Sequence, residues 1–258
     1  MLFHKKQNHK ATSVMQFLYP EGNYQALPRT AEIQVPVNVG IAFVPEARSE
    51  KGQDARSPIS EKEKARLLEL VKANFDQYDF IGKIEPIPST YLRRGGGFDS
   101  LKQAGGMFGV DVMVLLSYDQ IQFNDPKISS WAYWTVVGLY VVKGETNSTQ
   151  TLLDAVVIDI QSKNMLFRAP GTSDIKGDVS PLKQVKLQRE QSASGFRVAT
   201  ADLVDNLDQE LNAFRERIKS KKETDVQITY REGYSGAFGG FGVALALAAL
   251  AVGRRRRR

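Results

Sequence analysis

The 258-residue sequence contains no cysteine and only two histidines, His4 and His9. The lack of cysteine excludes disulfide bonds, thiolate nucleophiles and thiolate metal sites, although it does not indicate a cellular compartment. Both histidines lie in a polar stretch before the first predicted element, so we expect a solvated tail there, and a catalytic triad has no histidine to use. The sequence therefore predicts no metal ion, no cofactor and no catalytic residue.

The sequence also lacks a general excess of positive charge, despite a formal net charge of +6. Five of its 35 basic residues are the last five residues, and without them 30 lysines and arginines face 29 acidic residues. A protein that binds nucleic acid by its phosphates needs a basic surface, which a balanced body does not supply. We expect no nucleic-acid partner.

Two patterns in the body resemble catalytic or binding motifs without completing them. Gly95, Gly96 and Gly97 follow two arginines, but the Gly-Lys-Ser/Thr ending of a phosphate-binding loop is missing, so a turn before a helix is the simpler interpretation. Four aspartates lie near predicted strand ends, where they could act as acid and base, hold a cation, or be ordinary polar residues. They are Asp111, Asp119, Asp154 and Asp159.

The middle of the chain alternates strand and helix patterns. The run VNVGIAFVP (37–45) is rich in β-branched residues and ends at a proline, which indicates a buried strand. Ser60 and Glu63 have the spacing of a capping box for a helix that reaches Phe75. The other predicted elements are strands over 80–88, 110–123 and 225–231, helices over about 98–108 and 197–219, and a hairpin (151–161 and 165–174) that turns at Ser162–Asn164.

Two stretches allow more than one interpretation. The segment 129–142 fits a helix or a strand, and its β-branched and aromatic content favours a strand. Its aromatic residues could form a binding face or pack in the core. They are Trp131, Tyr133, Trp134 and Tyr140. The apolar stripe of the helix over 197–219 could pack on the sheet or form a short coiled coil, and sheet packing is the commoner arrangement.

These elements predict an α/β fold: a single mixed-sheet domain over residues 35–231, flanked by helices and preceded by an irregular linker over 1–34. Residues 232–258 form a separate C-terminal tail. The order of the elements is similar to that of the small periplasmic α/β domains of curli-secretion and Lpo-type lipoproteins. That similarity is one of architecture and implies no function.

The tail begins with glycines, continues as an apolar run and ends in five arginines. Residues 235–253 carry no charge and would span about 28 Å as a helix, close to the ~30 Å of a bilayer core, so we expect a C-terminal transmembrane helix. Its glycines crowd one end, which favours local unwinding over a helix-pairing motif. The positive-inside rule then keeps the closing arginines cytoplasmic and places the body outside. They are Arg254, Arg255, Arg256, Arg257 and Arg258.

The Gly-Gly pair, the apolar run and the arginine cluster resemble the GlyGly-CTERM sorting signal, and with this body, including HKKQNHKATSVMQFLYP near its start, the chain resembles the rhombotail lipoprotein family. The resemblance implies an exported bacterial envelope protein whose tail a rhomboid-type protease, rhombosortase, cleaves near Gly239 and Gly240. It also implies an N-terminal lipid on a cysteine upstream of Met1. Cleavage would convert a form with an inner-membrane span and a periplasmic body into an outer-membrane or cell-surface lipoprotein.

The body itself predicts binding or assembly without catalysis, and it does not indicate what is bound. Two other functions stay open on the sequence. One is a permanently anchored single-span membrane protein whose tail is not processed. The other, less favoured, is a periplasmic enzyme that uses the scattered aspartates.

Overall fold

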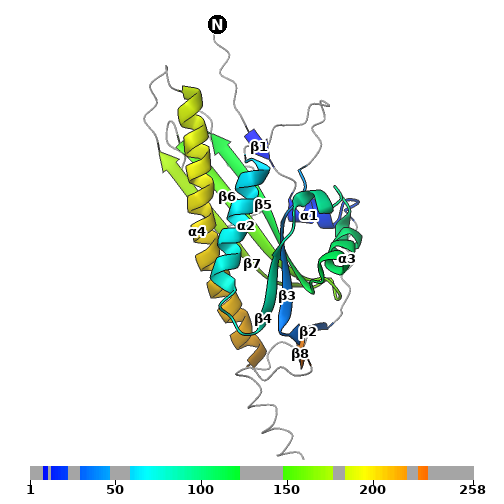
Figure 1. Cartoon of the computed structure of the whole chain (residues 1–258). Helices are drawn as coiled ribbons and strands as arrows, with labels where there is room; N and C mark the ends of the chain where they lie inside the picture. The colour runs from blue at the N-terminus through cyan, green and yellow to red at the C-terminus, as the bar shows by residue number, and fades with distance from the viewer. Residues whose placement is uncertain are drawn as a thin grey trace, which may run out of the picture.

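A computed structural model describes residues 8–10, 13–22, 30–46, 59–122, 148–176, 184–219 and 226–231 (Figure 1). Strands and helices alternate in its first half, and a long hairpin and a long helix follow. In chain order the elements are β1 (Asn8–Lys10), α1 (Val14–Leu18), β2 (Ala31–Val35), β3 (Val37–Phe43), α2 (Glu61–Phe75), β4 (Ile81–Pro86), the 3-10 turn η1 (Ser89–Tyr91), α3 (Gly97–Phe108), β5 (Val112–Gln122), β6 (Ser148–Asp159), β7 (Met165–Lys176), α4 (Gln184–Lys219) and β8 (Val226–Tyr230).

The main sheet is mixed and has the order β4-β3-β5-β6-β7. β3 is parallel to both β4 and β5, whereas β5, β6 and β7 are successively antiparallel. β1 pairs with β5 near Gln120, beyond the point where β3 leaves that strand at Phe43. The predicted mixed α/β domain and its hairpin are therefore confirmed.

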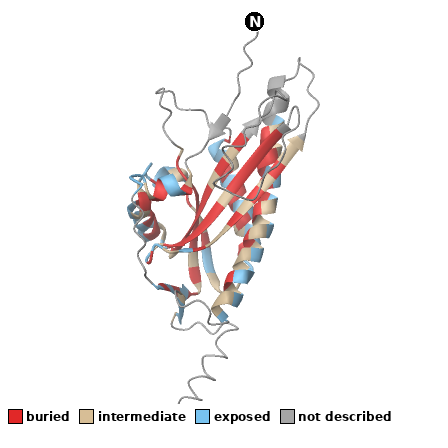
Figure 2. Cartoon of the chain, turned by 180° about the vertical axis from the view of Figure 1, so that it is seen from behind, coloured by how far each residue is buried: buried red, intermediate tan, exposed pale blue. Residues whose placement is uncertain are grey.

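Helices cover both faces of the sheet. α4 packs along β6 and β7 and α2 along β3 and β4, with α2 and α4 in contact on one face (Figure 1). α1 and α3 lie on the other face against β5. Because successive side chains of a strand point to opposite faces, each strand contributes to two cores. Within the described residues, the strands between the helix layers are accordingly largely buried (Figure 2).

A second, two-stranded sheet lies at one end of the domain, where β2 pairs in parallel with β8 from Ala31↔Val226 to Val35↔Tyr230 (Figure 1). The strand predicted over 225–231 is confirmed as β8, and it lies outside the main sheet. The predicted irregular linker over 1–34 needs correction, since it contains β1, α1 and β2. Ser13 and Gln16 form a complete capping box at α1, a signal that our sequence analysis missed.

The observed start of α2 agrees with the prediction, whereas that of α4 does not. Ser60 caps α2 by accepting a hydrogen bond from the Glu63 amide at 3.2 Å, as predicted. α4 is longer than the predicted helix, which was expected to begin at about residue 197. Ser192 and Gly195 lie in the part of α4 that was not predicted, and both residue types usually weaken helices. In the fold Ser192 Oγ donates to buried Gln120 Oε1 at 2.6 Å, and Gly195 lies so close to β6 that a Cβ would come within 2.5 Å of Thr151 Oγ1.

The predicted C-terminal transmembrane helix is not supported as part of the fold class: within the described residues, no helix is long and apolar enough to cross a membrane. The longest helix, α4, has charged residues along its length and uses its apolar stripe to cover the sheet. The predicted span 235–253 lies outside the described residues. The structure supports a mixed α/β domain.

Candidate functional site

An apolar cavity lies between one face of the main sheet and the helices α2 and α4, next to β2 and β8. Its volume is about 360 Å³, within the range of roughly 300–1,000 Å³ that is usual for small-molecule sites. The wall draws on seven strands and two helices. Its lining residues are Ile33, Val35, Val37, Val39, Ile41, Val71, Phe75, Phe80, Ile81, Ile84, Val112, Val114, Val157, Leu166, Phe167, Leu207, Leu211, Phe214, Arg215, Ile218, Lys219, Ile228 and Tyr230.

The wall follows from the periodicities of its elements. Alternate residues of β3 (Val37, Val39 and Ile41) face the same side of the sheet as Val112 and Val114 of β5, their neighbours in the register. On α4 the apolar residues from Leu207 to Ile218 recur at three- and four-residue steps and face the sheet, which confirms the predicted packing. The sheet face and the helix stripe therefore meet as two apolar surfaces.

The cavity forms where the two helices no longer cover the sheet together. α2 ends at Phe75, and the following Tyr78 donates a hydrogen bond to Asp208 of α4. α4 continues to Lys219. Beyond the Tyr78–Asp208 hydrogen bond it therefore faces the end of the main sheet and the β2–β8 pair without α2 beside it (Figure 1). The lining residues Ile228 and Tyr230 are 39% and 45% exposed, so the cavity reaches solvent beside β8.

Polar groups gather along α4 at this end of the cavity. The Arg215 guanidinium lies over the Phe80 ring, 4.9 Å from its centroid, and its Nη1 donates to Asn212 Oδ1 at 3.3 Å. Lys219 Nζ is 2.7 Å from Glu216 Oε1, and this contact lowers the pKa of the Glu216 carboxyl. The hydrogen bond to Asp208 and partial burial raise the pKa of Tyr78, which keeps that phenol protonated and donating.

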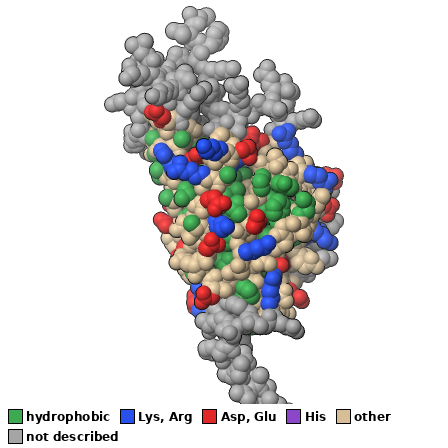
Figure 3. All heavy atoms as spheres, in the orientation of Figure 1, with side chains coloured by type: hydrophobic (Ala, Val, Ile, Leu, Met, Phe, Trp, Pro, Cys, Tyr) green, Lys and Arg blue, Asp and Glu red, His purple; other side chains and the backbone are tan. Residues whose placement is uncertain are grey.

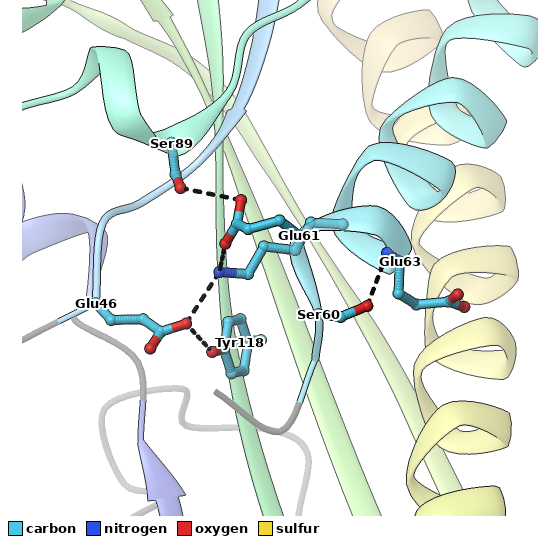
Figure 4. Close-up of polar contacts among 7 residues, drawn as sticks. Glu46, Ser60, Glu61, Glu63, Ser89 and Tyr118 are labelled. Carbon is cyan, nitrogen blue, oxygen red and sulfur yellow. Dashed lines mark hydrogen bonds and ion pairs between the residues drawn. The ribbon is translucent and has the colours of Figure 1, made fainter. Parts of the chain in front are cut away.

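A second polar cluster, whose residues are not part of the cavity lining, surrounds Lys64 at the first turn of α2 (Figure 4). The Lys64 side chain is buried, and its Nζ donates to Glu46 Oε1 at 2.9 Å and to Glu61 Oε1 at 2.8 Å. The Tyr118 hydroxyl donates to the same Glu46 oxygen at 2.8 Å. A buried cation needs such partners, so this cluster joins α2, the end of β3 and β5 as a structural link. No local sequence pattern indicates it, because its members are distant in the chain.

The four predicted aspartates do not come together. Asp111 Oδ2 accepts from the Asn38 amide at 3.0 Å and from Arg231 Nη2 at 2.5 Å, which ties β3 to the end of β8. Asp159 is buried in the hairpin turn and accepts from the Ser162 amide at 2.9 Å. Each therefore has a local structural role.

The other two aspartates lie on the paired strands β5 and β6, where the residue opposite Asp154 is Ser117, two positions from Asp119. Asp154 Oδ1 is 2.6 Å from Arg168 Nε across the hairpin, and burial raises the pKa of its carboxyl although Arg168 opposes that effect. Asp119 lies on β5 opposite Leu152. In the described part of the chain, no group of three or more histidine, cysteine, aspartate or glutamate residues is placed to hold a metal ion.

The remaining predicted features divide between described and undescribed residues. Gly95 and Gly97 have positive φ, and the predicted turn at Gly95 leads directly into α3, which begins at Gly97. The aromatic residues of 129–142, the choice of helix or strand there, Gly239, Gly240 and Arg254–Arg258 all lie outside the described residues. Charged side chains of both signs are interspersed on the face shown in Figure 3, in keeping with the balanced body composition.

Comparison with known proteins gives only distant structural similarity. No family model and no curated protein matches the chain. Solved structures that it resembles include protein XCC0632 of Xanthomonas campestris, described with the family model DUF330 (TM-score 0.35, 9% identity, 77% of this chain and 96% of that chain). Others are the dodecamer of a PelC point variant from Paraburkholderia phytofirmans (0.32, 10%, 69% and 90%) and the PelC dodecamer of the same organism (0.30, 9%, 79% and 96%). We draw no functional conclusion from similarity at this level.

Proposed function

We propose that this protein is an exported bacterial envelope lipoprotein of the non-enzymatic binding type, whose α/β domain binds an apolar ligand in the cavity between the sheet and α2 and α4. The observation that carries the proposal is the cavity itself, with its volume of about 360 Å³ and its almost wholly apolar wall. Of the predicted aspartates, Asp111, Asp154 and Asp159 are each engaged in a local contact with a backbone amide or an arginine.

The character of the wall favours an apolar occupant over water. A water molecule in a buried site needs two to four polar partners, whereas dry apolar cavities of even ~150 Å³ take up apolar ligands. Each Å² of apolar ligand surface removed from water contributes about 25 cal/mol to binding. The exposed Ile228 and Tyr230 mark the side from which a ligand can enter.

A direct test is a fluorescence titration of the full chain with the neutral apolar probe N-phenyl-1-naphthylamine, whose emission rises in apolar surroundings. We expect saturable binding of one probe per chain, abolished when the protein is unfolded in urea. A titration without a saturable signal, on protein shown to be folded by circular dichroism, would refute the binding function.

The sorting part of the proposal rests on the tail sequence, with Gly239 and Gly240 as the processing site and Arg254–Arg258 as the closing charge cluster. Glycines favour the extended backbone that a rhomboid-type protease takes into its active site. The double substitution Gly239→Leu with Gly240→Leu is therefore expected to leave the full-length form in cells that contain the protease. Mass spectrometry of the C-terminus reports the result, with Gly106→Ala in the described domain as a control. Unchanged processing of the double variant would exclude the glycines from the mechanism.

A further inference from the structure

We infer that the ligand is an amphiphile with one apolar chain and an anionic head group, and that the head group binds beside Arg215 and Lys219. The inference rests on the proposed apolar-ligand function and adds the chemistry of the ligand's polar end. Its basis is a juxtaposition: a continuous apolar wall and two basic side chains meet at the C-terminal turns of α4.

The sign of the charge at the wall is uniform. Among the described residues that line the cavity, the charged ones are Arg215 and Lys219, and both are basic. Two acidic residues of α4, Asp208 and Glu216, are outside the lining. Asp208 accepts a hydrogen bond from Tyr78, and Glu216 accepts one from Lys219. The charged groups of the cavity lining therefore complement a negative ligand group.

The position of the two side chains suits a head group at the rim. They are four residues apart on α4, so they project from the same side of the helix. Arg215 is half-buried over Phe80, whereas the side chain of Lys219 is 48% exposed. Long basic side chains pack their stems on apolar surface and keep the charge near water. A ligand whose apolar chain lies inside the cavity would place its charged head group between half-buried Arg215 and exposed Lys219.

The volume limits the size of the apolar part of the ligand. At about 360 Å³ the cavity lies near the lower end of the ~300–1,000 Å³ range of small-molecule sites, which favours a ligand with a single apolar chain over one with two. Carboxylate and phosphate head groups both fit the charge, and arginine can bind either one through paired hydrogen bonds.

The test measures displacement of N-phenyl-1-naphthylamine from the full chain by three ligands of equal chain length, the anions below their critical micelle concentrations and the neutral alcohol below its solubility limit. They are dodecanoate, dodecyl phosphate and neutral dodecanol. We expect dodecanol to bind about tenfold more weakly than the better of the two anions, since it lacks the charge-assisted hydrogen bonds. The ratio between the two anions distinguishes a fatty-acid source from a phosphorylated one.

Variants locate the head group. Arg215→Gln is expected to weaken anion binding about tenfold while dodecanol binding is unchanged, and Lys219→Gln is expected to weaken anion binding by a smaller factor. Arg217→Gln is the matched control, because Arg217 lies on the same helix over the Phe214 ring and does not line the cavity. Because Lys219 is exposed, Lys219→Gln is expected to fold normally. It therefore still tests the head-group site if the Arg215 variant folds poorly.

The outcomes separate the two proposals. Equal binding of the anions and dodecanol, or equal effects of all three variants, would overturn the head-group assignment and leave the apolar-ligand function standing. If neither the probe nor any of the three ligands bound, both would be overturned. Self-association through the opening, seen as a mass that increases with concentration in light scattering together with loss of ligand binding, would assign the site to a second copy of the chain and likewise overturn the inference.

Discussion

Gly171→Ala is expected to lower the free energy of unfolding by about 3 kcal/mol, since overpacking against rigid backbone lies at the upper end of such costs. Gly171 lies on β7 where α4 crosses the hairpin. An added Cβ would overlap the Ala199 carbonyl oxygen and lie 2.5 Å from Leu203 Cβ and 2.8 Å from the Leu203 amide nitrogen. These atoms belong to a long helix, and most of them to its backbone, so relief requires α4 to move away from the sheet.

Urea unfolding followed by circular dichroism measures this effect as a shift in midpoint. Gly106→Ala is the control, because it is a helical glycine of α3 whose added Cβ would meet nothing within 4 Å. That substitution should be neutral or should stabilise by up to about 1 kcal/mol, as alanine favours helix more than glycine does. If the two alanine variants unfolded at the same urea concentration, the close packing of β7 and α4 would be disproved.

Val39→Trp is expected to reduce binding of the apolar probe at least tenfold. Val39 lies on β3 between Ile84 of β4 and Val112 of β5, and all three line the cavity. An indole at this position occupies space that the ligand needs. Because the added ring enters existing empty volume, we expect the domain to stay folded, in contrast to an enlargement within the close-packed core.

Probe titration of the Trp variant is compared with Val39→Ala at the same position. The alanine variant enlarges the cavity, so it should bind the probe at least as well as the natural protein even though it costs about 1–3 kcal/mol of stability. Equal loss of binding in the two variants would show that the substitutions act through stability and that the cavity is not the binding site.

Sequence patterns predicted those elements whose signals are local. Ser60 and the apolar spacing up to Phe75 identified α2, and the turn at Ser162–Asn164 identified the hairpin of β6 and β7. The strand over 37–45 and the stripe on the helix over 197–219 were also recognisable, because period two and period 3.6 follow directly from backbone geometry. Each of these predictions needed only residues a few positions apart.

The errors arise where distant contacts override local preference. Ser192 and Gly195 look like helix breakers, yet a hydrogen bond to Gln120 and close contact with β6 make them suitable for α4. β2 and β8 are separated by most of the chain and form a sheet of their own, which no local pattern indicates. Lys64 is buried because Glu46 and Tyr118 meet it from other parts of the fold.

The sequence by itself determined the α/β class, the balanced charge of the body and the apolar faces of its strands and helices, since composition and periodicity are properties of the chain. Only the tertiary structure decided that two of these faces leave a cavity between them and that Arg215 and Lys219 border it. An apolar face looks the same in sequence whether it meets its partner fully or leaves a gap. The difference depends on where α2 ends relative to α4, which is a matter of packing.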